Sequence, residues 1–302
     1  MVYISLILIL ILTPIIAKVA LKFNIVDKPD NNLKLHEKVT PYLGGLAIYF
    51  SSIPIIYSNY YLFIFSFLIM GIGLIDDIKS ISPKVRFLME LVVCFYTVYF
   101  FNFGYNSFEI ILLSFAGVAI INAVNFVDGM DGVCTGTSLI ALLFLAFLLK
   151  DFYFVYLAVP ILGFLIYNFS PAKIFLGDAG SYYLGYILFF ASLNMKLVYG
   201  ANGFIISLIV FSIFIIDMLF AVIRRFLVKK SIFSGDRGHI YDGVRKRFNV
   251  SIKKTVLILY SFSITFGLVG VIAWKNLYLG VIISLVMIIF FGVWFKLYKY
   301  DK

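Results

Sequence analysis

Charged side chains are scarce in this chain of 302 residues. Only 13% of the residues are Asp, Glu, Lys or Arg, whereas 63% are hydrophobic. Soluble domains carry about 25% charged and about 45–50% apolar residues. A soluble fold is therefore excluded, because this much apolar surface needs the bilayer as part of its solvent. We expect an integral membrane protein.

Cysteine is rare in this chain, and internal sequence repeats are lacking. The two cysteines, Cys94 and Cys134, lie in apolar segments without metal-ligand or disulfide spacing, so we interpret them as apolar fillers. No internal repeat is evident, although many transporters are built from repeats. The net charge of +10 does not predict a nucleic-acid partner, because basic residues in membrane proteins usually mark cytoplasmic loops.

Long apolar segments follow one another from end to end, which predicts a single all-α polytopic membrane domain over residues 1–302. A spanning helix needs about 20 mostly apolar residues. We expect eleven such helices, near residues 2–22, 43–58, 60–76, 86–103, 107–123, 133–149, 152–168, 181–195, 202–223, 255–274 and 277–296. Lys18 and Lys22 follow the first apolar run, which favours a retained helix over a cleaved signal peptide.

The basic residues predict the orientation. With the N-terminus outside and the C-terminus cytoplasmic, only Lys150, Lys196 and Lys275 of the 25 lysines and arginines fall outside. The other twenty-two gather at the inner side, as the positive-inside rule requires. We expect the cytoplasmic loops to carry the function; they are 23–42, 77–85, 124–132, 169–180 and 224–254.

Carboxylates cluster in these same loops. Asp76 and Asp77 end an apolar helix, where the helix dipole disfavours them unless a cation or proton relieves the charge. Asp128 and Asp131 flank a Gly-containing turn, and Asn122 and Asn125 lie one turn earlier. Carboxylates at solvated helix ends are the plain interpretation of any single pair. Their convergence on one membrane face favours one polar site.

Two further segments favour phosphate chemistry. In NFSPAKIFLGDAGSYYLG, small residues beside Asp178 precede an apolar helix, and a helix N-terminus favours phosphate. Asp178 is the carboxylate we expect to hold Mg²⁺, which prefers carboxylates together with phosphate oxygens. The basic loop 224–254 suits a diphosphate clamp, or alternatively a stretch that binds lipid headgroups. Asp217, inside an apolar segment, suggests a structural ion pair with Arg224.

Together these segments resemble the polyprenyl-phosphate N-acetylhexosamine-1-phosphate transferases. VDKPDNNLKLHEKVTPYLGG is similar to the first cytoplasmic loop of that family, GLIDD to its aspartate pair, NAVNFVDGMDG to its nucleotide-sugar motif and IFLGDAGS to its metal motif. DMLFAVIRR has the spacing of a further family motif. The stretch TPYLGG and the overall length favour the N-acetylglucosamine branch over the pentapeptide-transferring branch.

The resemblance implies transfer of a sugar 1-phosphate from a UDP-N-acetylhexosamine to a polyprenyl (undecaprenyl) phosphate, with Mg²⁺ as cofactor and Mn²⁺ as a substitute. Asp76, Asp77 and Asp178 would be catalytic, with Asp178 on the metal. The implied substrate-binding residues are Lys34, His36, Asn122, Asn125, Asp128, Asp131, Asn168, Phe175, Gly177, Arg237 and His239.

One loop departs from the family pattern. Where the family has H-x-H-H, this chain reads His239-Ile240-Tyr241-Asp242, so no role passes to the later histidines. The resemblance implies a multi-pass plasma-membrane enzyme with its site on the cytoplasmic face, and the sequence leaves open whether it forms a homodimer. The alternative function is an ion-coupled transporter, which would need charged or broken helices at mid-membrane.

Overall fold

The computed structural model describes all residues except 28–38, 102–103, 232–237 and 301–302. Within these residues the chain forms twelve α-helices and one pair of two-residue strands. The bounds are α1 Val2–Lys22, β1 Val26–Asp27, β2 Thr40–Pro41, α2 Gly44–Ile56, α3 Tyr60–Lys79, α4 Pro83–Phe100, α5 Ser107–Phe126, α6 Val133–Leu149, α7 Phe152–Asn168, α8 Gly177–Val210, α9 Ser212–Leu227, α10 Ile240–Phe248, α11 Ile252–Lys275 and α12 Leu277–Trp294.

This architecture confirms an all-α membrane protein. Among the residues that the structure describes, six helices are long and apolar enough to cross a membrane: α1, α3, α5, α8, α11 and α12. Three shorter apolar helices, α2, α6 and α7, lie among them. The expected count of eleven spans and the sidedness of the termini stay predictions.

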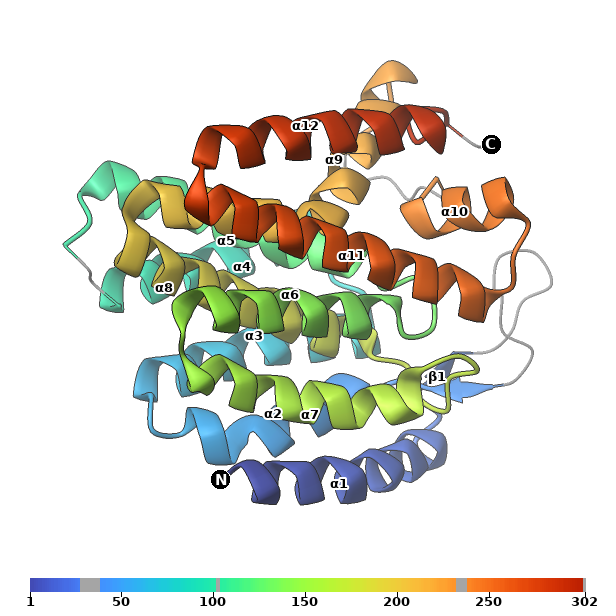
Figure 1. Cartoon of the computed structure of the whole chain (residues 1–302). Helices are drawn as coiled ribbons and strands as arrows, with labels where there is room; N and C mark the ends of the chain where they lie inside the picture. Colours follow the sequence, from blue (N-terminus) through green and yellow to red (C-terminus); the bar gives the residue numbers. More distant parts are fainter. Residues whose placement is uncertain (28–38, 102–103, 232–237, 301–302) are drawn as a thin grey trace.

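The helices run side by side, and the connections gather at two ends (Figure 1). The strand pair, α10 and the last turn of α12 lie at one end, on the right of Figure 1, whereas α1 begins at the other. The connection after α6 lies at that opposite end, with Lys150. The separation matches the two groups of loops expected from the charges. We call the end that carries α10 the polar end.

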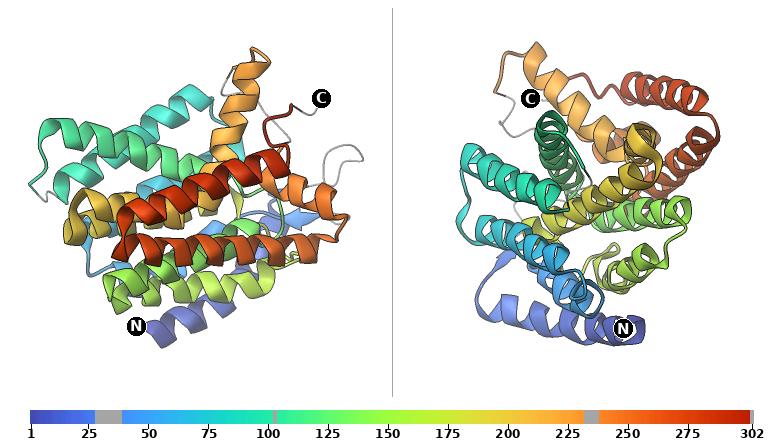
Figure 2. Two further views of the ribbon diagram at one scale, coloured as in Figure 1. Left: turned by 45° about the horizontal axis from the view of Figure 1, so that its top comes forward. Right: turned by 90° about the vertical axis from the view of Figure 1, so that its left-hand side faces the viewer.

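Helix α8 is the central element. It packs against α2, α3, α5, α6 and α11, and it crosses the middle of the bundle in the end view (Figure 2). Helix α8 contains the expected helix near 181–195 and the first part of the one expected near 202–223. Gly200 breaks it with φ +64°, a conformation open to glycine, close to the expected break.

The expected helix near 202–223 is not continuous. The chain breaks at Phe211, and α9 stands steeply across the other helices (Figure 2). Charge explains the change of direction: Asp217, Arg224 and Arg225 are buried on α9, and burying a charge in hydrocarbon without a partner is costly. The steep course brings Asp217 and Arg224 to partners at the polar end, which are described below.

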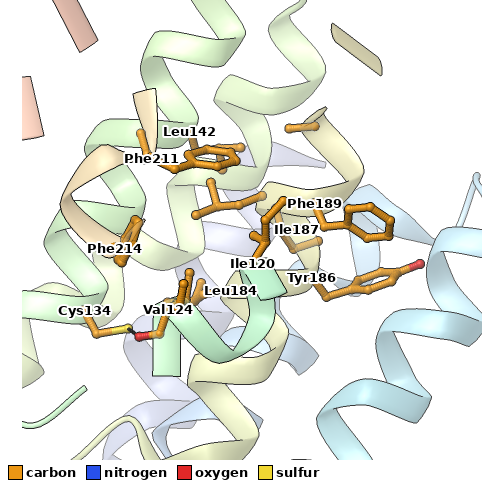
Figure 3. Packing of buried hydrophobic residues seen from close by; sticks show 14 of the residues in the cluster. Ile120, Val124, Cys134, Leu142, Leu184, Tyr186, Ile187, Phe189, Phe211 and Phe214 are labelled. Carbon is orange, nitrogen blue, oxygen red and sulfur yellow. Dashed lines mark hydrogen bonds between the residues drawn. The ribbon is translucent and has the colours of Figure 1, made fainter. Parts of the chain in front are cut away.

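The core forms where α5, α6, α8 and α9 meet (Figure 3). Ile120 and Val124 of α5 face Leu184 and Ile187 of α8, with Phe214 of α9 beside them. All five side chains are at most 5% exposed. Cys94 and Cys134 are free and buried, as expected of apolar fillers. Tight packing of this kind fixes α5 and α8 relative to each other, and both carry site residues.

Candidate active site

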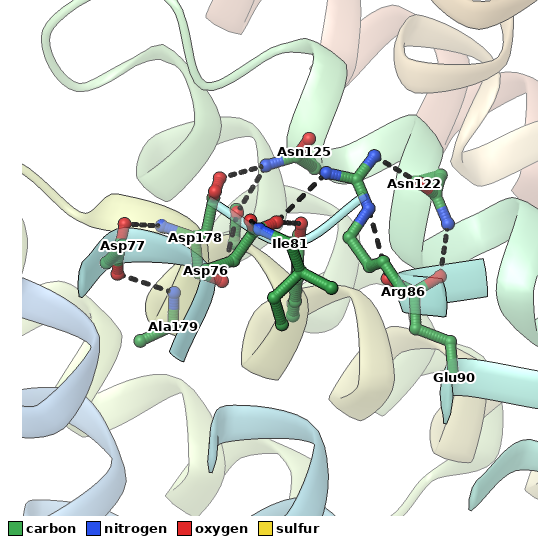
Figure 4. Close-up of polar contacts among 11 residues, drawn as sticks. Asp76, Asp77, Ile81, Arg86, Glu90, Asn122, Asn125, Asp178 and Ala179 are labelled. Carbon is green, nitrogen blue, oxygen red and sulfur yellow. Dashed lines mark hydrogen bonds and ion pairs between the residues drawn. The ribbon is translucent and has the colours of Figure 1, made fainter. Parts of the chain in front are cut away.

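The junction between α3 and α8 begins the site. The two carboxylate oxygens of Asp77 accept hydrogen bonds from the backbone N–H groups of Asp178 (2.8 Å) and Ala179 (3.0 Å). Asp77 therefore caps the first turn of α8, whose N–H groups have no partner within the helix, and its charge complements the helix dipole. Figure 4 shows both bonds.

Glycines make this junction possible. Gly177 has φ +74°, and an added Cβ would lie 2.8 Å from the Asp77 carboxylate. A Cβ on Gly45 of α2 would lie 2.2 Å from the backbone nitrogen of Gly180. A Cβ on Gly73 of α3 would lie 2.4 Å from the carbonyl oxygen of Asp178. The backbones of α2 and α3 thus rest directly against the start of α8.

Asp76 is held by three donors from separate parts of the chain. Its Oδ1 accepts the N–H of Ile81 at 2.6 Å, and its Oδ2 accepts Arg86 Nη1 at 3.1 Å and the Tyr182 hydroxyl at 2.9 Å. The residue is 8% exposed. The plain interpretation of the sequence put both aspartates of the pair at a solvated helix end. That expectation is wrong, because both carboxylates tie helices together.

Arg86, in the first turns of α4, joins Asp76 to a buried network. Its Nη2 donates to Asn122 Oδ1 at 3.4 Å, and its Nε lies 4.0 Å from Glu90 Oε1. Asn122 in turn donates to Glu90 Oε2 at 2.5 Å. The Glu90 carboxylate, fully buried, thereby orients an amide and a guanidinium toward the same space (Figure 4).

Asp178 faces α5. Its Oδ1 accepts a hydrogen bond from Asn125 Nδ2 at 2.7 Å, and the same amide donates to Ser181 Oγ at 3.0 Å. The two asparagines expected from the sequence thus lie one turn apart on α5, as predicted. One is oriented by Glu90 and the other by Asp178.

Asp128 lies just beyond α5 and near the other acids. Its side chain is partly buried. Burial, followed by the charges of Asp178, Asp77 and Asp131, raises the pKa of Asp128 well above its usual range. A carboxylate in such surroundings gains from a nearby cation, because an opposite charge favours its ionised form.

His239 enters from the start of α10. Its Nδ1 lies 2.6 Å from Asp217 Oδ2, and Asp217 Oδ1 accepts the N–H of Ile240 at 2.7 Å. The ring stacks on Tyr241 with centroids 5.2 Å apart. Burial alone lowers the pKa of His239, but the Asp217 carboxylate outweighs burial and raises it. The partner of Asp217 is therefore a site histidine, and the expected ion pair with Arg224 is replaced by a bond from Arg224 to the carbonyl of Leu297 (2.6 Å).

These groups surround a cavity of about 660 Å³. Its lining combines carboxylates, amides, cations and apolar side chains from α4, α5, α8, α9 and α10. The lining residues are Pro83, Arg86, Phe87, Phe115, Val118, Ala119, Asn122, Asn125, Phe126, Asp128, Gly129, Asp178, Met218, Val222, Arg225, His239 and Tyr241. The structure thus brings together five residues expected from the sequence: Asn122, Asn125, Asp128, Asp178 and His239.

Other expected residues support the cavity without lining it. Asp131 accepts the N–H of Ala172 at 2.9 Å. Buried Asn168 accepts from Thr135 (2.8 Å) and donates to the carbonyl of Ile174 (3.0 Å). The ring of Phe175 lies against Tyr42. These bonds fix the segment that leads into α8, as Gly177 and Asp77 do. Lys34, His36 and Arg237 lie outside the described residues.

The donor set fits a hard cation. Asp128 and Asp178 line the same cavity, and carboxylate oxygens are preferred Mg²⁺ ligands. Within the described residues, no group of three or more His, Cys, Asp and Glu side chains has metal-binding geometry. Two carboxylates are enough for Mg²⁺, because it commonly takes one or two protein carboxylates and completes its shell with water and phosphate.

Comparison with known proteins shows which family has a sequence like this one. The family model for glycosyl transferase family 4 matches residues 59–196. A probable undecaprenyl-phosphate N-acetylglucosaminyl 1-phosphate transferase of Bacillus subtilis is 33% identical, over 96% of this chain and 89% of its own length. This chain belongs to glycosyl transferase family 4. The family match contains α3 through the first part of α8, and hence the Asp77–α8 junction, Asn125 and Asp178.

Two further relatives show which branch of glycosyl transferase family 4 this chain resembles. An undecaprenyl-phosphate alpha-N-acetylglucosaminyl 1-phosphate transferase of Thermotoga maritima is 31% identical, covering 86% of this chain and 85% of its own length. A phospho-N-acetylmuramoyl-pentapeptide-transferase of Dictyoglomus thermophilum is 29% identical, covering 78% and 83%. The expected resemblance to the N-acetylglucosamine branch is confirmed.

Sequence reasoning missed several residues of this family 4 site. Arg86 was counted only as a topology marker, although a basic residue nine positions after Asp77, at the start of a helix, could have suggested the cavity. Arg225 ends the DMLFAVIRR motif and Tyr241 lies in the His239–Asp242 stretch, but the sequence assigned neither residue a role in the site. Tyr182 looked like part of an apolar helix. Its role depends on Asp76, which is 106 positions away in the chain.

Proposed function

We propose that this chain transfers N-acetylglucosamine 1-phosphate from UDP-N-acetylglucosamine to a polyprenyl phosphate. An oxygen of the lipid phosphate attacks the β-phosphorus of the UDP-sugar. The bond from that phosphorus to the bridging oxygen breaks, and UMP leaves with the electron pair. The product is a polyprenyl-diphosphate-linked sugar, the first lipid-linked intermediate of a cell-envelope glycan.

The composition of the 660 Å³ cavity carries the proposal. Its lining includes the polar residues Asn122, Asn125, Asp128 and Asp178 and the apolar residues Phe87, Phe115, Val118, Met218 and Val222. The polar group suits a nucleotide-sugar and the apolar group suits a prenyl chain. Arg86 and Arg225 also line the cavity and supply cations for phosphate. We do not propose the alternative function of an ion-coupled transporter, because the relatives described above are transferases.

The residues present suit the charge that develops during the transfer. Phosphoryl transfer needs alignment and charge neutralisation more than covalent help from the protein. Arg86, fixed by Asp76 and Glu90, can donate to phosphate in two directions. A phosphate monoester has its second pKa near 6, so the lipid phosphate is largely ionised at pH 7 and needs no strong general base. Asp76 and Asp77 then act by positioning Arg86 and the start of α8.

Asp178 and Asp128 would hold Mg²⁺, and bound Mg²⁺ neutralises phosphate charge. His239, oriented by Asp217, is a further donor on the cavity wall. We also propose that the polar end faces the cytoplasm of the plasma membrane, which the distribution of basic residues supports.

The test is release of UMP by the purified protein. Detergent-solubilised enzyme, undecaprenyl phosphate and Mg²⁺ are combined with UDP-N-acetylglucosamine, and UMP and lipid-linked sugar are quantified. We expect equimolar products that depend on both substrates. Parallel reactions with UDP-N-acetylgalactosamine and UDP-glucose test the sugar. UMP release without lipid phosphate, or none with any UDP-sugar, would contradict the proposal.

A further inference from the structure

A second cavity, separate from the catalytic one, lies between α10 and the C-terminal segment. It has a volume of about 250 Å³ and shares no lining residue with the catalytic cavity. The residues that line it are Gly238, Asp242, Gly243, Lys246, Arg247, Trp294, Phe295, Lys296, Leu297 and Lys299. We call it the basic groove. Four of these side chains are cationic and one is acidic.

The basic groove has a fixed wall. After α12, Lys296 takes φ +55°. Its N–H donates to the carbonyl of Val293 (3.1 Å), and the N–H of Leu297 donates to that of Gly292 (2.9 Å). This is a Schellman-type helix end. Arg224 anchors it from α9 by its bond to Leu297. Lys296 and Lys299 are thus held beside α10 by backbone geometry.

Aromatic and apolar groups adjoin the cations. The guanidinium of Arg247 lies 5.3 Å from the ring centroid of Trp294, which is 42% exposed. Tryptophan at the end of a spanning helix is typical of the membrane–water interface. Phe290, one turn earlier on α12, is 49% exposed, and its ring centroid lies 5.0 Å from that of Trp294. Beside Phe290 runs an apolar face of Ile282, Val286, Ile289 and Val293, each about 60% exposed. An acyl chain can lie along this face.

We propose that the basic groove binds the headgroup of an anionic phospholipid, with the acyl chains along the exposed face of α12. A soluble anion would use the lysines but not the apolar face that continues from them. Anionic lipid is attracted to clusters of basic residues at the membrane surface. The groove also accounts for basic residues of the 224–254 loop that the catalytic cavity does not use, namely Lys246 and Arg247.

The two tryptophans of the chain allow a direct binding test. Trp274 lies at the end of α11 away from the polar end, so Trp274→Phe leaves Trp294 as the only reporter. The variant is reconstituted in phosphatidylcholine vesicles with increasing fractions of brominated phosphatidylglycerol or brominated phosphatidylcholine, and quenching of Trp294 is measured. We expect a preference for phosphatidylglycerol of about fivefold or more, because each basic group near an anionic surface contributes about 1 kcal/mol.

Matched charge variants locate the preference. Lys296→Asn with Lys299→Gln removes two charges from the groove, and asparagine tolerates the left-handed backbone at 296. Lys253→Gln with Lys254→Gln removes two exposed charges from the first turn of α11, at the same end but outside the groove. The first pair should abolish the preference and the second should keep it. Thermal melting of each variant confirms that it is folded.

Two outcomes overturn the proposal. Equal quenching by the two lipids, or equal loss of the preference in both double variants, would show that the groove is not a specific lipid site. Loss of the preference on adding glycerol 3-phosphate at constant ionic strength would assign the groove to soluble phosphate. The binding measurement uses neither UDP-sugar nor turnover, so its failure leaves the proposed function untouched.

Discussion

At the scale of single residues, the site separates groups that face the cavity from groups that hold them in place. Asp178 faces the cavity and is oriented by Asn125. Asp77 instead uses both carboxylate oxygens on the first turn of α8. The two acids are neighbours, yet only one is available to a cation. Their substitutions should therefore behave differently.

Asp178→Asn should lower turnover by at least about 10²-fold, roughly 2.7 kcal/mol of barrier. The change keeps the shape and one oxygen but removes the formal charge that we propose holds Mg²⁺. Raised Mg²⁺ should restore part of the rate, since occupancy follows mass action, and Mn²⁺ should support the wild type. Initial rates across a Mg²⁺ titration check this.

The matched control for Asp178→Asn is Asp151→Asn. Asp151 caps α7 at the opposite end of the bundle, and asparagine caps helices about as well as aspartate. The control should keep wild-type rates. An Asp178→Asn enzyme with full activity and an unchanged Mg²⁺ requirement would move the metal to other ligands, with Asp128 and Asp131 the next candidates.

Asp76→Ala should reduce stability as well as turnover. The variant leaves the Tyr182 hydroxyl, the N–H of Ile81 and the Arg86 guanidinium without their common acceptor, and each unsatisfied buried group costs about 1–3 kcal/mol. A thermal melt in detergent measures the first effect and UMP release the second. An unchanged melting temperature would show that the Asp76 network carries no stability.

Protonation of His239 gives a pH signature. The Asp217 carboxylate keeps the pKa of His239 raised, so the protonated ring persists to higher pH than an ordinary histidine. Stability from the pair is fully present below the unfolded pKa of about 6.5, and it is lost as pH rises through the raised pKa. A rate that uses the protonated ring falls over the same interval.

Asp217→Asn should therefore shift the alkaline limb of kcat/KM to lower pH, because burial then lowers the pKa of His239 without the larger opposing effect of Asp217. The shift is checked by measuring kcat/KM from about pH 5.5 to about pH 9, which covers the range where histidine titrates. His239→Gln should remove the limb altogether. An alkaline limb that stays in place in Asp217→Asn would assign it to another group.

At the scale of elements, the start of α8 is set by close backbone contact with α2 and α3. Gly45→Ala places a Cβ 2.2 Å from the nitrogen of Gly180, where only backbone lies. We expect a loss of about 1–3 kcal/mol from overpacking, and reduced turnover because Asp178 is displaced with α8. Gly71→Ala on α3 is the control, since its Cβ would meet nothing within 4 Å. Thermal melts of both variants check the difference.

Gly180 illustrates the same point. Its place beside Asp178 at a helix N-terminus predicts that a side chain there would push the diphosphate away from the helix. In the structure its Cβ position is filled by Leu176 and by Gly45 of α2, so the glycine serves helix packing. A substitution such as Gly180→Val should lower stability first. If it lowered only nucleotide-sugar use and left the melt unchanged, the ligand explanation would return.

At the scale of the whole molecule, the loops divide between two ends, and the charges predict which end is cytoplasmic. A reporter inserted after Gly104 should give an external signal, and one fused after Lys302 a cytoplasmic signal. Gly104 suits the insertion because nothing lies within 4 Å of its Cβ position. Alkaline phosphatase and green fluorescent protein fusions check the two sides. A cytoplasmic signal from the insertion would overturn the orientation.

The sequence by itself determined the membrane class, the helical fold, the polar end and most of its chemistry. These properties follow from composition and from local order: apolar length, charge distribution and short motifs such as GLIDD and GDAGS. Asn122 and Asn125 could also be predicted from the sequence, because their spacing on one helix places both on one face. Family resemblance rests on the same short segments.

Only the tertiary structure decided which polar residues face the cavity and which support it. Asp77 meets the N–H of Asp178 across 101 positions of sequence, and Asp76 meets Tyr182 across 106. No local pattern encodes such pairs, because they arise from how α3 and α8 pack. The same holds for Arg86, for the Asp217–His239 pair and for the basic groove, where α10 and the end of α12 are brought together by the packing of α11 against both.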